Sequence, residues 1–120
     1  KRVCPLCPQT MRWHTKPILK RRNGWRLTEN FNPYKNTAHH FLIIDPVHKE
    51  KLEELTSRDW SSLTYLHNWA IKKFRIKGGG IAMRFGDTRL TGASVAHLHA
   101  HLIIPKIIQK KSQAVSFLIG

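Results

Sequence analysis

The chain has 120 residues, of which 21 are lysine or arginine and seven are aspartate or glutamate, so its formal net charge is +14. This length excludes two separate hydrophobic cores and predicts a single domain over 1–120. No apolar run approaches the ~20 residues that span a bilayer and no apolar signal segment opens the sequence, which predicts no membrane partner and a cytoplasmic location. The positive charge favours anionic partners, either a phosphate-bearing ligand or a nucleic acid.

Residues 1–16 are predicted to form an irregular segment that packs against the body of the domain. It contains both cysteines of the chain, Cys4 and Cys7. They lie too close together to frame a disulfide-stapled fold. A Cys-x-x-Cys pair is a common half of a metal site, and this is the interpretation that we prefer to a pair of reduced, buried thiols.

A hairpin and a short strand follow. The Asn23-Gly24 pair lies in a basic turn between apolar segments at 18–19 and 25–27, which is a typical hairpin signal. The apolar run 41–44 predicts a strand that ends where an Asp-Pro pair follows, because the residue before a proline is restricted.

One long helix is predicted from Thr56 or Ser57, either of which can cap its first turn, to about Phe74. Apolar side chains recur at three- and four-residue steps and would form one buried face: Trp60, Leu63, Leu66, His67, Ala70, Ile71 and Phe74. The glycine run 78–80 then connects to a strand at 81–85 and a loop at 86–92. This run lacks the Lys-Ser/Thr pair of a phosphate-binding loop, so it is read as a connector.

The segment 92–105 carries three histidines at alternate positions in an apolar run. Alternate residues of a strand share a face, so His97, His99 and His101 are predicted to project together. The residues between and after them would face the core: Leu98, Ala100 and Leu102. Three crowded imidazoles would repel one another if all were charged, so at least one should be neutral near pH 7 and able to act as a nucleophile, base or metal ligand.

This motif, with small residues before it, resembles the signature of the histidine-triad superfamily of nucleotide hydrolases and transferases. Residues 30–36 resemble the nucleoside-binding loop of that family, 39–48 the strand that follows it, and 83–88 the strand and turn before the triad. Strands that flank one long helix predict an α+β domain with a mainly antiparallel sheet, and the resemblance implies the same fold. It also implies a homodimer whose sheets join across the subunits.

The resemblance implies catalytic roles for three histidines. His99, the middle residue of the triad, would attack the α-phosphate of a nucleotide and form a nucleotidyl-histidine intermediate, which water or a phosphorylated acceptor resolves. His101 would contact phosphate oxygens and assist the leaving group. His40 would line the same pocket; its neighbour His39 is the alternative and should point to the other face of the strand.

The resemblance also implies a substrate-binding set. Ser94 would donate to phosphate, together with the main-chain amides of Gly92 and Ala93. Asn30 would hold the ribose hydroxyls, with Asn32 as the competing assignment and an ordinary turn role open for both. The family often has a glutamine near the position of Ala93, and its absence leaves the leaving group open.

A zinc site is implied as well. The resemblance adds His48 and His97 to Cys4 and Cys7 as a structural Cys2His2 zinc site. Such a metal would tie the irregular first residues to the strand of the triad. His97 would then be a ligand, and the triad would work as a pair beside it.

Three functions remain open from the sequence. The preferred one is an enzyme that cleaves or transfers a nucleoside monophosphate group from a phosphoramidate, a dinucleoside polyphosphate or a nucleotide sugar. The second is removal of an adenylate from DNA ends, which the charge of +14 favours and the lack of an appended DNA-binding element disfavours. The third is a non-catalytic nucleotide-binding module, against which the three histidines and Ser94 argue.

Overall fold

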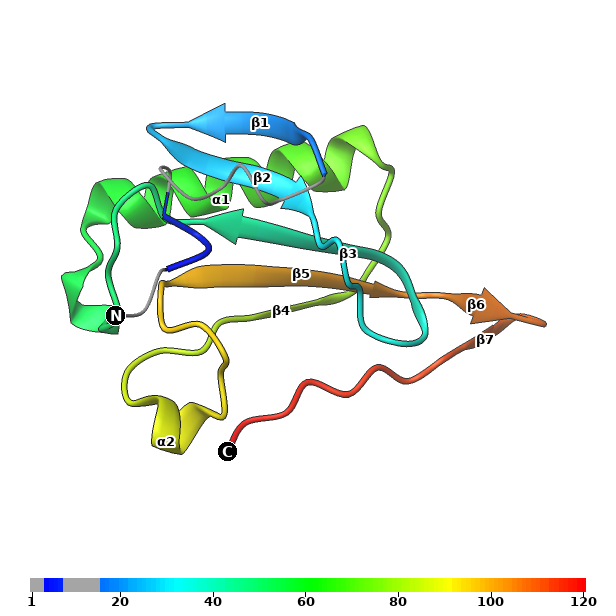
Figure 1. Cartoon of the computed structure of the whole chain (residues 1–120). Helices are drawn as coiled ribbons and strands as arrows, with labels where there is room; N and C mark the ends of the chain where they lie inside the picture. The colour runs from blue at the N-terminus through cyan, green and yellow to red at the C-terminus, as the bar shows by residue number, and fades with distance from the viewer. Residues whose placement is uncertain (1–3, 8–15) are drawn as a thin grey trace.

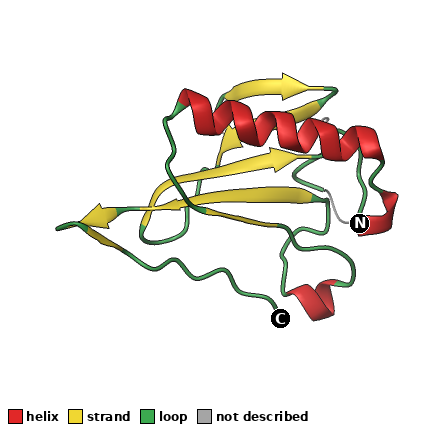
Figure 2. Cartoon of the chain, turned by 180° about the vertical axis from the view of Figure 1, so that it is seen from behind, coloured by secondary structure: helices red, strands yellow, loops and turns green. Residues whose placement is uncertain are grey.

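The computed structural model describes residues 4–7 and 16–120. Its main layer is a five-stranded antiparallel sheet in the order β1-β2-β3-β5-β4 (Figure 1). The strands are β1 (Ile18–Arg22), β2 (Trp25–Glu29), β3 (Thr37–Ile44), β4 (Gly80–Ala82) and β5 (His99–Pro105). One long helix, α1 (Ser57–Lys73), covers one face of the sheet, as Figure 2 shows from the helix side. This arrangement confirms the predicted α+β class.

The predicted hairpin is present as β1 and β2. Its turn places Asn23 and Gly24 at φ of 49° and 84°, the left-handed conformation that a two-residue hairpin turn needs. Trp25 then enters the core and donates from its indole nitrogen to Asp59 at the start of α1, at 3.0 Å. The hairpin and the helix are therefore fixed to each other at this end.

Helix α1 begins and ends close to the predicted positions. The Thr56 hydroxyl accepts from the backbone nitrogen of Asp59, and the Asp59 carboxylate accepts from the backbone nitrogen of Thr56. The prediction that Trp60 and Ile71 belong to the buried face is wrong, because Trp60 is 45% exposed and Ile71 is 37% exposed. Both lie about a quarter of a turn from the centre of the buried stripe, at the margin of the helix–sheet contact.

The core lies between α1 and the sheet. Leu98, Ala100 and Leu102 are buried in it beside Phe41 and Ile43, which confirms that these residues of the histidine segment face inward.

The opposite face of the sheet carries the alternate residues of the same strands, both polar and apolar. There β3 contributes His40, Leu42 and Ile44, and in the register of the sheet Leu42 lies opposite His101 and Ile44 opposite His99. Residues 4–7 lie over this face, where Leu6 packs with Leu42 and Ile44. Of the predicted irregular segment over 1–16, residues 1–3 and 8–15 lie outside the described residues.

Four short elements and a tail complete the fold. The 3-10 helix η2 (Leu52–Glu54) precedes α1, and helix α2 (Thr88–Thr91) lies in the connection between β4 and β5. Strands β6 (Ile107–Ile108) and β7 (Lys111–Ser112) form a hairpin that extends beyond the sheet. Residues 113–120 then return towards α2 (Figure 1). Within the described residues, no helix is long and apolar enough to cross a bilayer.

Candidate functional site

Three imidazoles meet on the sheet face opposite α1. The rings of His99 and His101 lie side by side on β5, with their centroids 4.9 Å apart. His40 lies diagonally across from His101 on β3, and its Nε2 is 2.8 Å from His101 Nδ1. His39, the alternative, points to the other face, where it stacks on Phe41 with ring centroids 5.4 Å apart.

His97 departs from the predicted pattern. Strand β5 begins at His99, so His97 precedes the strand, and its ring lies in a second cluster rather than in a row with the other two. Its backbone remains with the pair, because the His97 carbonyl oxygen accepts a hydrogen bond from His99 Nδ1 at 2.8 Å.

The hydrogen bonds assign a proton to one nitrogen of each ring. His99 Nδ1 donates to a carbonyl, so His99 Nε2 carries an unprotonated lone pair. His40 Nδ1 accepts from the backbone nitrogen of Tyr34 at 3.1 Å, so His40 Nε2 donates to His101 Nδ1. The proton of His101 is then on Nε2, a buried atom that has no hydrogen-bond partner in the described part of the chain. The cluster therefore presents one lone pair and one N–H donor.

Burial keeps these imidazoles neutral. It lowers the pKa of His40 to about 4 and the pKa of His101 to about 3, with the nearby His99 as a further cause in both. Burial is also the largest cause of the lowered pKa of His99, and the charge of Arg84 adds to it. A neutral His99 is the form that a nucleophilic role requires.

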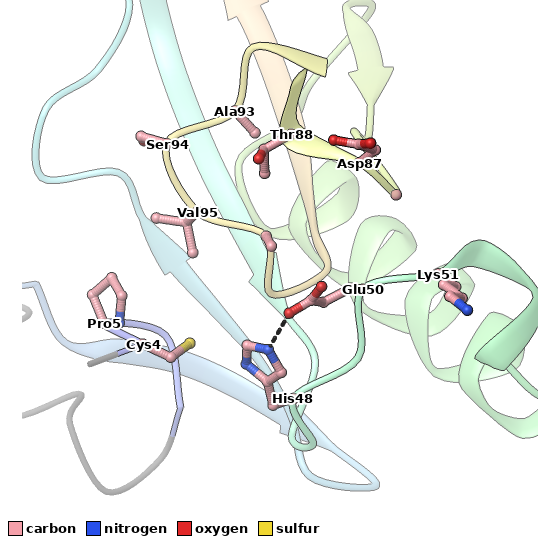
Figure 3. Close-up of a pocket in the computed structure, with 12 residues that line it drawn as sticks. Cys4, Pro5, His48, Glu50, Lys51, Asp87, Thr88, Ala93, Ser94 and Val95 are labelled. Atoms are coloured by element: carbon pink, nitrogen blue, oxygen red, sulfur yellow. Dashed lines mark hydrogen bonds and ion pairs between the residues drawn. The ribbon is translucent and has the colours of Figure 1, made fainter. Parts of the chain in front are cut away.

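The second cluster contains Cys4, Cys7, His48 and His97, whose ligand atoms all lie within 4.8 Å of one another. Cys4 Sγ is 3.4 Å and Cys7 Sγ 3.5 Å from His97 Nδ1. His97 Nε2 donates to the carbonyl of Asp45 at 2.7 Å, and His48 Nε2 lies 2.8 Å from a Glu50 carboxylate oxygen (Figure 3). Both rings thus keep Nδ1 for the centre of the cluster, and these four residues could hold a metal ion.

The predicted phosphate donors lie elsewhere. Ala93 and Ser94 line a cavity of about 700 Å³ beside the second cluster (Figure 3). His40, His99 and His101 are not among the residues that line this cavity. The expectation that the amides of Gly92 and Ala93 are available is wrong for this structure. Gly92 N donates to the carbonyl of Thr88 at the end of α2, and Ala93 N donates to the Thr91 hydroxyl.

The loop before β3 holds the two asparagines. Asn30 Oδ1 accepts from the backbone nitrogen of Asn32, and Asn30 Nδ2 lies 3.5 Å from His40 Nε2. Asn30 therefore faces the imidazoles and shapes its own loop, whereas Asn32 is exposed.

Sequence reasoning gave no role to three residues that border the imidazoles. The Tyr34 ring lies 4.3 Å from the His40 ring, and the Phe117 ring lies 5.0 Å from the His101 ring, both between centroids. The Arg84 guanidinium lies over Phe117, at 4.0 Å from its ring centre. Arg84 had a usable signal, since it is the one charged residue in the apolar segment 81–85.

No protein-family model matches the chain, and no curated protein matches its sequence. Solved structures match its fold. A histidine triad nucleotide-binding protein from Candida albicans is 20% identical with a TM-score of 0.73, and the match covers 98% of this chain and 85% of that one. A Zn-bound histidine triad family protein from Mycobacterium smegmatis is 16% identical with a TM-score of 0.64, over 92% and 79% of the two chains.

A third similar structure is a diadenosine triphosphate hydrolase from Plasmodium falciparum, at 21% identity and a TM-score of 0.60, over 80% of this chain and 65% of that one. At these sequence identities the similarity shows a shared fold. It agrees with the resemblance found in the sequence, which is confirmed at the level of the fold. The chain has the fold of the histidine-triad proteins.

Proposed function

We propose that this protein is a histidine-triad enzyme that cleaves or transfers a nucleoside monophosphate group at the α-phosphate of a nucleotide. One observation carries the proposal: the hydrogen bond from His99 Nδ1 to the His97 carbonyl, which leaves His99 Nε2 unprotonated beside the Nε2–H of His101. A lone pair next to a donor is the arrangement that attack on phosphorus needs, because negative charge builds on the oxygens during attack.

The reaction would proceed in two steps. His99 Nε2 attacks the α-phosphorus, the bond from phosphorus to the leaving group breaks, and the leaving group departs with the electron pair. An oxygen of water or of a phosphorylated acceptor then attacks the same phosphorus, the bond from phosphorus to His99 Nε2 breaks with its electron pair returning to the nitrogen, and an attacking water gives up one proton to the solvent. His101 Nε2–H stabilises the phosphate oxygens in both steps, and His40 keeps this proton in place through its own hydrogen bond to His101 Nδ1.

The substrate class is a small nucleotide with a substituent on its α-phosphate. The names of two similar structures, a nucleotide-binding protein and a diadenosine triphosphate hydrolase, support this class. The charge of +14 supports a polyanion. Dinucleoside polyphosphates, nucleoside phosphoramidates and nucleotide sugars are the members to test, and Asn30 and Asn32 are the proposed ribose contacts.

The direct test is to trap the intermediate. Mixing the protein with diadenosine triphosphate, quenching in alkaline denaturant, in which a phosphorus–nitrogen bond survives, and mapping the peptides should find an adenylyl adduct on His99. The same treatment of His39→Ala, which leaves the pocket intact, should give the same adduct. An adduct on another residue, or turnover that persists in His99→Ala, would remove His99 from the reaction.

A second function is favoured by the distribution of charge. Residues 60–120 contain a single acidic residue, Asp87, and nine basic residues: Lys72, Lys73, Arg75, Lys77, Arg84, Arg89, Lys106, Lys110 and Lys111. An enzyme that removes an adenylate from DNA ends would use such a surface for phosphate contacts. A panel of nucleotides and 5′-adenylated DNA, run at several salt concentrations, separates the two functions. Turnover of the DNA alone, with a steep loss as salt rises, would favour the second.

We also propose that Cys4, Cys7, His48 and His97 bind a structural zinc ion. With Zn–S bonds of about 2.3 Å and Zn–N bonds of about 2.0 Å, the edges of a tetrahedral site are roughly 3.3–3.7 Å long. The measured separations between ligand atoms include 3.3, 3.4 and 3.5 Å, which fit that tetrahedron. All four ligands would come from the protein, so the metal would hold residues 4–7 against the sheet rather than take part in the reaction.

A homodimer joined through the sheet is the proposed assembly. The terminal strands are β1, which carries Lys20, Arg21 and Arg22, and β4, whose Ile81 is 59% exposed. Charged residues discourage strand pairing at an edge, so β4 is the edge that suits a second copy. Light scattering should give twice the mass of the chain, and Ile81→Asp should halve it. A monomeric parent protein would contradict this assembly.

A further inference from the structure

Residues 113–120 cross from the β6–β7 hairpin to the imidazoles and are fixed along the way. Asn36 Nδ2 donates to the carbonyl of Ala114 at 2.9 Å, and Gly120 N donates to the carbonyl of Thr91 at 3.0 Å. Between these points Phe117 packs its ring against His101 and Tyr34. This segment therefore covers part of the imidazole cluster at which the proposed reaction would occur.

Arg84 is a cation beside these imidazoles, and the segment occupies its guanidinium. Nε and Nη2 both donate to the carbonyl oxygen of Leu118, at 2.9 and 2.6 Å, and Nη1 lies 3.4 Å from the Tyr34 hydroxyl. Arg84 is in none of the ion pairs found among the described residues. A guanidinium can bind two oxygens of one anion, whereas here Nε and Nη2 share one neutral carbonyl oxygen, so a phosphate would be a stronger partner for the same two donors.

The neighbouring imidazole of His101 has a hydrogen-bond donor that an anion could also satisfy. His101 is 4% exposed, and its Nε2–H has no hydrogen-bond acceptor in the described part of the chain. A buried donor without an acceptor costs free energy, and an arriving oxygen would remove that cost. Arg84 and His101 contact the same Phe117 ring, so one displacement of that ring would uncover both donors.

We propose that Arg84 binds a phosphate oxygen of the substrate beside the imidazoles, and that the Leu118 carbonyl holds this guanidinium until the substrate displaces residues 116–120. The inference rests on the proposed function for its ligand class, a nucleoside phosphate. It adds a cationic binding residue and a segment that competes with the substrate for it. The contribution of Arg84 to the free energy of nucleotide binding is then a difference: the free energy of its contact with phosphate less that of its contact with the Leu118 carbonyl.

Equilibrium binding of AMP and of adenosine tests the first half without any turnover. Loss of a charge-assisted contact should weaken AMP binding by about tenfold to a hundredfold in Arg84→Gln. Arg84→Lys should recover part of that loss, and adenosine, which has no phosphate, should bind all three proteins equally. Equal AMP affinity in the parent protein and in Arg84→Gln would overturn the role of Arg84.

Phe117→Ala tests the second half, with Ile108→Ala on the exposed β6–β7 hairpin as the matched apolar truncation. Removing the ring should loosen the segment and tighten AMP binding several-fold, whereas Ile108→Ala should leave it unchanged. Hydrogen exchange of the peptide over residues 113–120 should speed up when AMP binds, because Gly120 N loses its acceptor. Weaker AMP binding in Phe117→Ala, or slower exchange on binding, would overturn the competition.

These outcomes are distinct from those of the proposed function. Arg84-dependent AMP binding by a protein that turns over no substrate would reject the enzyme and keep the inference. A His99 adduct with AMP affinity that is independent of Arg84 would do the reverse.

Discussion

The carbonyl oxygen of His97 accepts the hydrogen bond that orients His99, at 2.8 Å, while the side chain of His97 belongs to the cysteine cluster. One residue thus links the two sites. Whatever fixes the His97 ring also fixes the backbone that sets the tautomer of His99, so the proposed metal and the proposed nucleophile are mechanically coupled.

The first prediction concerns this coupling. Protein purified without added metal should contain one zinc per chain by elemental analysis, and a Cys4→Ser/Cys7→Ser variant should contain almost none. The variant should melt at a lower temperature and turn over substrate about 10- to 100-fold more slowly, because the support of His99 is lost. Lys51→Ala, an exposed change at the same cavity, should keep both metal and activity. Full zinc content in the double variant would contradict the site.

The second prediction separates the histidines by their roles. His99→Ala should reduce turnover of diadenosine triphosphate by several orders of magnitude, as loss of a nucleophile does, while AMP binding survives. His40→Ala should have a smaller effect, because it disturbs the proton of His101 rather than the attacking atom. His39→Ala should match the parent protein in steady-state kinetics. A parent-like rate in His99→Ala, or a severe loss in His39→Ala, would reverse the assignment.

The third prediction concerns acid stability. Burial lowers the pKa of His40 to about 4 from an ordinary value of 6.5, so between these values the unfolded chain binds the proton and the folded chain does not. The free energy of unfolding should be at its plateau above pH 6.5 and fall as the pH approaches 4.

The slope from His40 alone is about 1.4 kcal/mol per pH unit. Urea titrations at several pH values should therefore give a shallower slope for His40→Gln than for the parent protein. The zinc site is common to both proteins and cancels in this comparison. Identical slopes would mean that His40 is not kept neutral by the fold.

The fourth prediction tests the helix–sheet contact. Leu66 is fully buried between α1 and the sheet, so Leu66→Ala should lower the free energy of unfolding by about 2–5 kcal/mol. Trp60→Ala should cost less than about 1 kcal/mol, although it removes a larger side chain, because Trp60 is 45% exposed. Denaturant melts of the two variants check this order, and a reversed order would place Trp60 in the core.

Local patterns in the sequence were sufficient for the elements of the fold. The Asn23-Gly24 turn, the cap at Thr56 and the inward positions of Leu98 and Leu102 each depend on a few neighbouring residues, and the structure has all of them. The predicted ends of the strands were less accurate. Strand β4 is shorter than the predicted 81–85, and β5 starts at His99, because strand ends depend on pairing with residues far away in the chain.

The site was predictable where its residues are close in sequence or form a known motif. The face shared by His99 and His101 follows from the period of a strand. The places of Arg84 and Phe117 do not, because their meeting depends on the path of residues 113–120 across the fold. Nor could the sequence reveal that the amides of Gly92 and Ala93 are used within α2 and its end, since the short helix itself is not evident in the residues.

The contact between Arg84 and Leu118 is made to a main-chain atom, and the Leu118 side chain is itself 74% exposed. Every amino acid supplies the same carbonyl, so the identity of residue 118 can change while the contact persists. Residue substitution at this position will therefore not reveal the contact, and neither will a search for residues that vary together with Arg84. It is encoded by the length and direction of the chain from Pro105 onwards, and a one-residue insertion there would disrupt it more than any replacement at 118.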